Sequence, residues 1–246
     1  MPAAGYRCPV VIRATAAFLG VLLAVAMVAN GAVTLLDVAA RASYTTRTSY
    51  AAPSRLAIKI DEGRVELVRA PAGGRLTVRA RVTGGLASPD VRRTYEDGNL
   101  TLDADCPIVL VISCGARWTV GVPDGTAVGV DSSGGDIAVD GVRARGTLRV
   151  RSSAGDVRVT DVGSRRVDAS SSAGDVHVEL SAAPTELRAE SSAGDVHVVV
   201  PDVVYDLDAS TSAGDRRSNV RTDPESRRRL VARSSAGDVD VEARGR

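Results

Sequence analysis

The chain has 246 residues and a formal net charge of +1 at pH 7; 44% of its residues are hydrophobic but only 3% are aromatic. The near-zero charge excludes recruitment of nucleic acid or other polyanions by the field of the whole molecule. The scarcity of rings argues against the aromatic core of a typical enzyme or sandwich and favours a thin core of Val, Leu and Ala.

Residues 14–36 form an uncharged apolar segment that Arg7 and Arg13 precede and Asp37 closes. At about 1.5 Å per residue, a helix of this length spans a hydrocarbon core of about 30 Å. Because the arginines stand on its N-terminal side, we expect a cytoplasmic tail (1–13), a single transmembrane helix (14–36) and an extracellular C-terminal domain. The alternative is a cleaved signal peptide, whose apolar region usually has about 7–15 residues. Either way, the rest of the chain is exported.

The segment that follows is expected to be irregular at first. Residues 37–55 have no sustained apolar period and are rich in Ala, Ser and Thr, which is typical of a stalk or linker. Residues 56–130 alternate between apolar and polar positions in short stretches that Gly- and Pro-containing turns separate. They predict strands that form an N-terminal cap, or less regular rungs of the repeat that follows.

Two cysteines lie close together within this β region. Cys106 and Cys114 have no histidine nearby to complete a zinc site. In an oxidising compartment such a pair most simply forms a disulfide. Two unpaired buried thiols are the alternative.

Residues 131–246 contain a sequence repeat. The motif Ser-Ser-Gly/Ala-Gly-Asp-Val/Ile-x-Val recurs about every 20 residues, a period typical of structural units that stack on their neighbours. Glycine allows a positive φ at a turn, and an aspartate after it can accept backbone N–H bonds there. The predicted turn residues are therefore Gly135, Asp136, Gly155, Asp156, Gly174, Asp175, Gly194, Asp195, Gly214, Asp215, Gly237 and Asp238.

Apolar and polar residues alternate on both sides of each turn, as in residues 148–150 and 157–159. Period two with many valines indicates strands that bury one face. We predict an all-β fold, a β-solenoid or β-helix-like stack of rungs of about 20 residues, each with two strands. Stacking in chain order would align four outward residues of alternating charge, which favours parallel, in-register pairing. These residues are Arg149, Asp168, Arg188 and Asp208.

The two histidines of the chain, His177 and His197, occupy the same outward position in successive repeats. Together with Arg158 and Arg217 they predict a surface stripe. Two imidazoles at the spacing of neighbouring strands could share a metal ion, which is the alternative. In chain order, however, arginines flank them and a third ligand is missing, so we predict a solvated surface without a metal or cofactor. The row of turn aspartates suggests Ca²⁺ binding as an alternative, but turn capping is the simpler explanation.

No catalytic motif is present: the sequence lacks a Gly-x-Ser-x-Gly elbow, a Walker loop and a His-Glu-x-x-His helix. We therefore predict no catalytic residues and no enzymatic activity.

The repeated motif, with Val-Pro-Asp-Gly-Thr at 122–126 and Arg-Thr-Asp-Pro at 221–224, resembles a bacterial family of adhesin-like proteins called domain of unknown function 4097. The resemblance covers about residues 56–242. It implies a β-strand repeat fold, often behind one N-terminal span, and an adhesin label. Arg216 departs from the motif, where other copies have Val or Ile, so the rung at Gly214 is expected to be bent or splayed.

We therefore expect a membrane-anchored, exported, non-enzymatic adhesin or scaffold of the cell envelope. Its strand faces would present rows of polar side chains to a surface glycan or an envelope protein. The alternative is an envelope-state sensor or accessory subunit of a membrane or regulatory complex. Because a tail of residues 1–13 is too short to fold, such a sensor would need another protein to carry its signal.

Overall fold

The computed structural model describes residues 23–25, 27–28, 30–32, 34, 39, 42–60, 63–71, 74–84, 90–105 and 114–245. The described residues between 23 and 39 are helical. The predicted tail (1–13) and much of the predicted span (14–36) lie outside the described residues. Within what is described, no helix combines the length and the apolarity that crossing a membrane requires.

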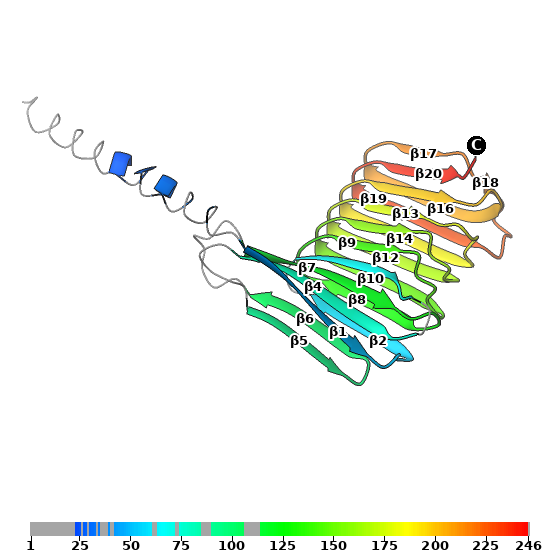
Figure 1. The fold of residues 1–246 in the computed structure, drawn as a ribbon. Coiled ribbons are helices and arrows are strands. Elements are labelled where there is room, and N and C mark those ends of the chain that lie inside the picture. Colours follow the sequence, from blue (N-terminus) through cyan, green and yellow to red (C-terminus); the bar gives the residue numbers. More distant parts are fainter. Residues whose placement is uncertain are drawn as a thin grey trace, which may run out of the picture.

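The rest of the described chain is all-β and forms two ten-stranded sheets, here called sheet A and sheet B (Figure 1). Sheet A has the spatial order β1 (Ala42–Tyr50), β4 (Leu76–Gly84), β7 (Cys114–Val122), β3 (Arg64–Arg69), β9 (Ile137–Asp140), β11 (Val157–Thr160), β13 (Val176–Glu179), β15 (Val196–Val200), β20 (Val239–Ala243) and β17 (Arg216–Ser218). Sheet B has the order β18 (Arg221–Thr222), β16 (Val204–Ala213), β19 (Arg229–Ala236), β14 (Glu186–Ala193), β12 (Arg166–Ala173), β10 (Thr147–Ala154), β8 (Ala127–Ser132), β2 (Arg55–Ile60), β6 (Asn99–Asp105) and β5 (Asp90–Glu96).

Each repeat forms one rung, with a strand in sheet B, a Gly-Asp turn and a strand in sheet A. Rungs pair in parallel and in register, so that Leu148 lies beside Val167 and Val157 beside Val176. The stack of rungs is visible in Figure 1 as two facing layers of arrows. The predicted stack of two-strand rungs is therefore what the chain forms.

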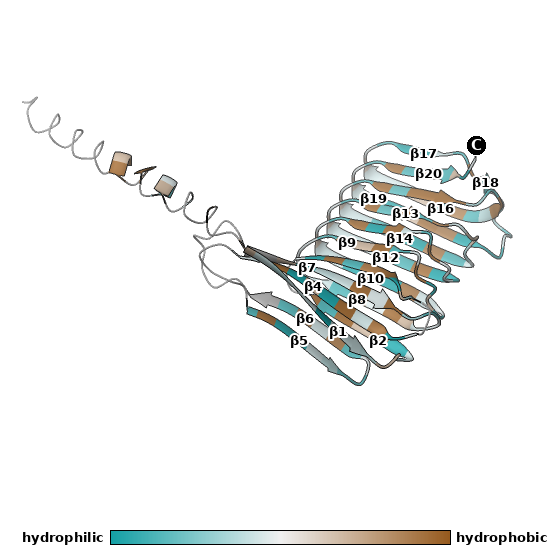
Figure 2. Cartoon of the chain, in the orientation of Figure 1, coloured by the Kyte–Doolittle hydropathy of each residue, from teal (hydrophilic) through white to brown (hydrophobic). Residues whose placement is uncertain are grey.

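The core lies between the two sheets and follows from the alternation in the sequence. On sheet A the inward column includes Val157, Val176 and Val196, which are at most 1% exposed. On sheet B it includes Leu148 and Leu187, which are fully buried. Because the rungs are in register, apolar and polar bands alternate along neighbouring strands (Figure 2). Burial of these columns provides the main stabilisation of the stack.

The order of the rungs in space departs from their order in the chain at the C-terminal end. The last rung, β19–β20, lies between β14–β15 and the rung β16–β17, which precedes it in sequence. Residues 219–228, which contain the short strand β18 and the Arg-Thr-Asp-Pro motif, make the return connection. The rung at Gly214 is therefore the terminal rung of the stack.

The N-terminal end has a similar reversal. The rung β2–β3 pairs with β8–β9 on one side and with β6 and β7 on the other. The connection from β7 to β8 contains the Val-Pro-Asp-Gly-Thr motif of residues 122–126, and Asp124 within it forms an ion pair with Arg69 at the end of β3. The region 56–130 thus combines one regular rung with strands that cap the stack.

Residues 42–50, which the sequence analysis places in a stalk, instead form β1, antiparallel to β4. β1 is the edge strand of sheet A and is largely exposed, so it needs no apolar alternation, and the sequence gives no period-two signal. The rings of Tyr50 on β1 and Tyr95 on β5 lie 4.6 Å apart between centroids. Since β1 and β5 belong to different sheets, this pair closes the N-terminal end of the core.

The predicted column of alternating charge is correct only in part. Arg149 and Asp168 are neighbours and form an ion pair at 3.1 Å. Arg188, however, lies beside Val231 rather than Asp208, because the last rung is inserted between them. Asp208 pairs instead with Arg233.

Candidate binding surface

The glycines of the repeat lie directly above one another at the turns between the sheets. Gly155, Gly174, Gly194 and Gly237 have φ between 131° and 146°. A Cβ at Gly194 would collide with the carbonyl oxygen of Gly174 in the neighbouring rung. Positive φ and close stacking of backbones both require glycine here, so these residues have a structural role.

The turn aspartates form a hydrogen-bonded ladder along the stack. The backbone N–H of Asp175 donates to the carboxylate of Asp156 at 2.9 Å, and that of Asp195 to Asp175 at 2.8 Å. The ladder continues from Asp195 to Asp238 and then to Asp215, following the spatial order of the rungs. The carboxylates of Asp156, Asp175, Asp195 and Asp238 therefore each cap the turn of the next rung rather than their own.

The first serine of each motif is also structural. Ser171, Ser191 and Ser234 are 4–5% exposed, and each donates its hydroxyl to a glycine carbonyl of the adjacent rung at 2.8 Å. The hydroxyls thus satisfy carbonyl groups at the edge of the core. The buried serine, the glycine and the aspartate all make contacts between neighbouring rungs. The stacking of the rungs therefore explains why the motif recurs in each repeat.

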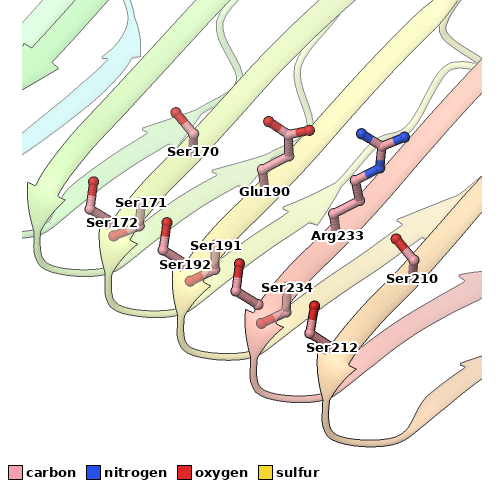
Figure 3. A pocket seen from close by; sticks show the side chains of 11 residues that line it. Ser170, Ser171, Ser172, Glu190, Ser191, Ser192, Ser210, Ser212, Arg233 and Ser234 are labelled. Atoms are coloured by element: carbon pink, nitrogen blue, oxygen red, sulfur yellow. The ribbon is translucent and has the colours of Figure 1, made fainter.

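The second serine of each motif has no such role and faces solvent. Ser172, Ser192, Ser235 and Ser212 are exposed and occupy equivalent positions at the ends of adjacent strands of sheet B. Figure 3 shows Ser172 and Ser192 projecting from the opposite side of their strands to the buried Ser171 and Ser191. We call this set the serine row; its hydroxyls recur at about 4.8 Å, the spacing of the strands.

A second outward row runs beside the serine row, two residues earlier in each strand. It contains Ser170, Glu190, Arg233 and Ser210, in register from β12 to β16 (Figure 3). The two rows line an open depression of ≈ 380 Å³. Its lining offers hydroxyl donors and acceptors, with one carboxylate and one guanidinium at its centre.

The same face of sheet B has another depression, of ≈ 560 Å³, over β2, β8 and β10. Small outward residues, Ala57, Ala127 and Gly129, form part of its lining. Arg55 and Arg145, both exposed, line it as well. The outer face of sheet B therefore combines hydroxyl-rich and arginine-rich regions.

The stripe predicted from Arg158, His177, His197 and Arg217 lies on the outer face of sheet A, but in a different order. Arg158, His177 and His197 are successive neighbours, whereas Asp240 lies between His197 and Arg217. Burial, and next the charge of Arg158, lower the pKa of His177 from its ordinary value. The prediction that an arginine lies on each side of the histidine pair is therefore correct for Arg158 and wrong for Arg217.

The predicted disulfide joins Cys106 to Cys114. Cys114 begins β7, but Cys106 lies outside the described residues. The bridge stays a prediction.

The surface residues that the sequence analysis missed are those whose neighbours depend on the spatial order of the rungs. The serine row is visible in the repeat, but its relation to Glu190 and Arg233 is not. Asp240 and Glu242 beside His197 are missed for the same reason. The arrangement as a whole offers a polar surface for binding.

A family model described as Toastrack DUF4097 matches residues 46–245. The chain belongs to this family. The match covers the two-sheet stack of the Toastrack DUF4097 chain and includes residues 46–55, which the resemblance in sequence did not. No curated protein is similar enough to count as a relative.

Several solved structures are similar to this Toastrack chain. One is described as a putative cell adhesion protein from Clostridium sporogenes, with a TM-score of 0.49 and 11% identity over 83% of this chain and 100% of that chain. A second is a putative adhesin from Bacteroides fragilis, with a TM-score of 0.42 and 13% identity over 80% and 97%. A third, from Parabacteroides distasonis, is described as a putative lipid binding protein, with a TM-score of 0.34 and 10% identity over 81% and 96%. These similarities are too low to assign a function to the chain.

Proposed function

We propose that the chain is a membrane-anchored, exported, non-enzymatic protein that binds a surface glycan through the outer face of sheet B, as an adhesin or envelope scaffold. The observation that supports this most directly is the serine row beside Ser170, Glu190, Arg233 and Ser210 (Figure 3).

The chemistry of this surface suits a ligand rich in hydroxyl groups. A serine hydroxyl both donates and accepts hydrogen bonds, as a sugar hydroxyl does. No aromatic side chain lines the depression of the serine row, so each single contact is expected to be weak. Repetition from rung to rung compensates for this weakness, because a polymeric ligand that engages several rungs gains avidity without a new kind of contact.

The same surface is poorly suited to nucleophilic catalysis. A serine needs an adjacent base to become a nucleophile. None of the residues that line the depression is histidine, and the only carboxylate among them, Glu190, forms an ion pair with Arg188 at 2.9 Å. Binding is therefore the better interpretation of these hydroxyls.

The test uses the full chain, purified in detergent, against a panel of immobilised bacterial surface polysaccharides. We expect the triple variant Ser172→Asp/Ser192→Asp/Ser235→Asp to bind the wild type's ligand at least about tenfold more weakly, because charged groups replace the hydroxyl row. The matched control is Ser43→Asp/Ser49→Asp/Ser218→Asp, which adds the same charge at exposed positions on strands of sheet A. Unchanged binding of the serine-row variant, or equal losses in both variants, would refute the assignment of this face.

Anchoring and export are a separate prediction. Arginines before residues 14–36 support a cytoplasmic N-terminus, and an oxidising compartment supports the pairing of Cys106 with Cys114. Protease added to intact spheroplasts should digest the β domain and spare the tail, and a non-reducing peptide map should join the two cysteine peptides. Full protection of a C-terminal tag contradicts export, and thiol labelling of both cysteines contradicts the bridge.

A further inference from the structure

Three potential metal ligands converge on the outer face of sheet A. His197 on β15 and Asp240 on β20 are register partners, and Glu242 lies two residues further along β20 on the same face. One ligand atom from each of the three lies within 4.8 Å of the others. All three residues are half-buried, with side-chain exposures of 37% for His197 and 33% for Asp240. Their side chains are therefore partly held by neighbours and still accessible to an ion.

This cluster is a consequence of the inserted rung. In chain order the neighbour of His197 would be Arg217, whose positive charge would repel a cation. Because β20 lies between β15 and β17, Asp240 stands there instead, with its Oδ2 3.9 Å from His197 Nδ1. The fold thus replaces a repelling neighbour of the imidazole with an acidic one.

We infer that His197, Asp240 and Glu242 form a binding site for a divalent transition-metal ion, with Zn²⁺ as the best-fitting one. Imidazole nitrogen and carboxylate oxygen are both regular Zn²⁺ ligands, with bonds of about 2.0–2.2 Å. Three protein ligands leave a further position for water, as in open zinc sites. Two carboxylates neutralise the charge of the dication, and the presence of an imidazole disfavours Ca²⁺ and Mg²⁺, which prefer oxygen ligands.

The arginines near this cluster either form ion pairs with other carboxylates or lie further away. The guanidinium of Arg217 lies 3.5 Å from Asp215, and that of Arg244 lies 2.9 Å from Glu179. Arg158 is separated from His197 by the strand that carries His177. The charge closest to the imidazole of His197 is therefore the carboxylate of Asp240.

His177 is a neighbour of the site rather than a ligand. Its ring stacks on that of His197, with centroids 5.0 Å apart and an interplanar angle of 14°. It does not belong to the group whose ligand atoms converge. His177 therefore supplies a matched control, because its loss removes an imidazole from the same surface and leaves the proposed ligands intact.

Metal binding would fasten the last rung to the stack. The ligands come from β15 and β20, so the ion would join the inserted rung to the rung before it. An ion that binds the folded chain and not the unfolded chain raises the free energy of unfolding by mass action. The site thus predicts a stability that depends on Zn²⁺ concentration.

The experiment is a calorimetric titration of ZnCl₂ into the untagged full chain in detergent, after dialysis against EDTA and then against buffer. We expect one Zn²⁺ per chain at this site and a higher Tm with Zn²⁺. The variants His197→Gln and Asp240→Asn/Glu242→Gln should each bind at least about tenfold more weakly and lose the Tm increase, since an open site depends on each of its ligands. His177→Gln should keep both the affinity for Zn²⁺ and the Tm increase.

Each alternative outcome overturns the inference. Equal binding by the wild type and the His197→Gln variant would assign the ion to other groups, such as the cysteines. Equal losses in His177→Gln and His197→Gln would assign it to a histidine pair. Absence of Zn²⁺ binding by the wild type would exclude the site. Thermal unfolding in EDTA tests whether the variants fold. Because all the substituted residues lie on the surface, each variant should keep the Tm that the wild type has in EDTA.

Discussion

At the residue scale, the turns between the sheets depend on glycines that are packed against one another. Gly194 has a φ of 146° and lies against the backbone of Gly174, while Gly237 lies against Gly194 in turn. A side chain at such a position meets backbone atoms, which cannot move without disturbing two rungs. The turn glycines therefore allow the turns to stack at the spacing that the paired strands set.

We predict that Gly194→Ala lowers the free energy of unfolding by about 2–4 kcal/mol, because it combines strain at positive φ with a backbone collision. Gly129→Ala is the control: its added Cβ meets nothing within 4 Å and its φ is not positive, so it should change stability by less than about 1 kcal/mol. Urea unfolding followed by circular dichroism measures both. Similar losses in the two variants would show that rungs do not stack through these glycines.

Tyr205, a fully buried side chain near the C-terminal end, gives a prediction about alkaline pH. Burial raises the pKa of Tyr205 to about 12 from 10.0, so the folded chain holds the phenolic proton more tightly than the unfolded chain does. The neutral phenol therefore contributes about 3 kcal/mol to the free energy of unfolding; this contribution is complete below pH 10 and is lost between pH 10 and about 12.

The control for this prediction is Tyr205→Phe, which lacks the hydroxyl that donates to the Pro201 carbonyl at 3.1 Å. The variant should be less stable than the wild type at neutral pH, by about 1 kcal/mol, and the difference should shrink or reverse above pH 10. Unfolding free energies measured from pH 8 to 12 test this. A constant difference over that range contradicts the raised pKa.

At the scale of the elements, the two faces of each strand in a rung have different surroundings, one in the core and one at the surface. In β13, Val176 and Val178 are fully buried, and His177 between them is half-buried on the outer face. Parallel, in-register pairing extends each of these positions into a column along the sheet. A substitution therefore acts through the column to which its residue belongs.

We predict that Val176→Asp costs several kcal/mol, since it places an unpaired charge between two rungs in the core. His177→Asp should change stability by less than about 1 kcal/mol, because its side chain reaches solvent beside Arg158. Thermal unfolding of the full chain compares the two. Equal effects would mean that the assignment of inner and outer faces is wrong.

At the scale of the whole molecule, the stack ends in two different ways. The N-terminal end is closed by β1 and β5, with Tyr50 against Tyr95. At the C-terminal end the rung β16–β17 places Arg216 in the inward column, where Val239 is its neighbour. Arg216 is exposed because no further rung covers it in the described chain. A charge at the open end discourages the addition of another chain.

We predict that Arg216→Val promotes self-association, because it extends the apolar column of sheet A to an open end. Arg217→Val makes the same chemical change on the outer face of the same strand and should leave the chain in its original state. Sedimentation velocity of the full chain in detergent at rising concentration measures the difference. Equal behaviour of the two variants contradicts the role of Arg216 as an end cap.

The sequence by itself determined the two-strand rung, its inner and outer faces and its turns. These features are local: period two gives the faces, and Gly-Asp gives the turn. The inward valines such as Val176 and the outward Arg158 and His177 could be assigned without a structure for this reason. The edge strand β1 could not, because even its less exposed face, with Thr46 and Thr48, is only half-buried and so needs no run of apolar side chains.

Only the tertiary structure decided the order of the rungs. Nearly identical rungs can pair with one another in any order, since each offers the same strand edges and the same column of small apolar side chains. The connections at residues 122–126 and 219–228 reverse the order at the two ends, and their effect depends on contacts between residues distant in the chain, such as Arg69 with Asp124. That order separates Arg188 from Asp208 and places Asp240 beside His197.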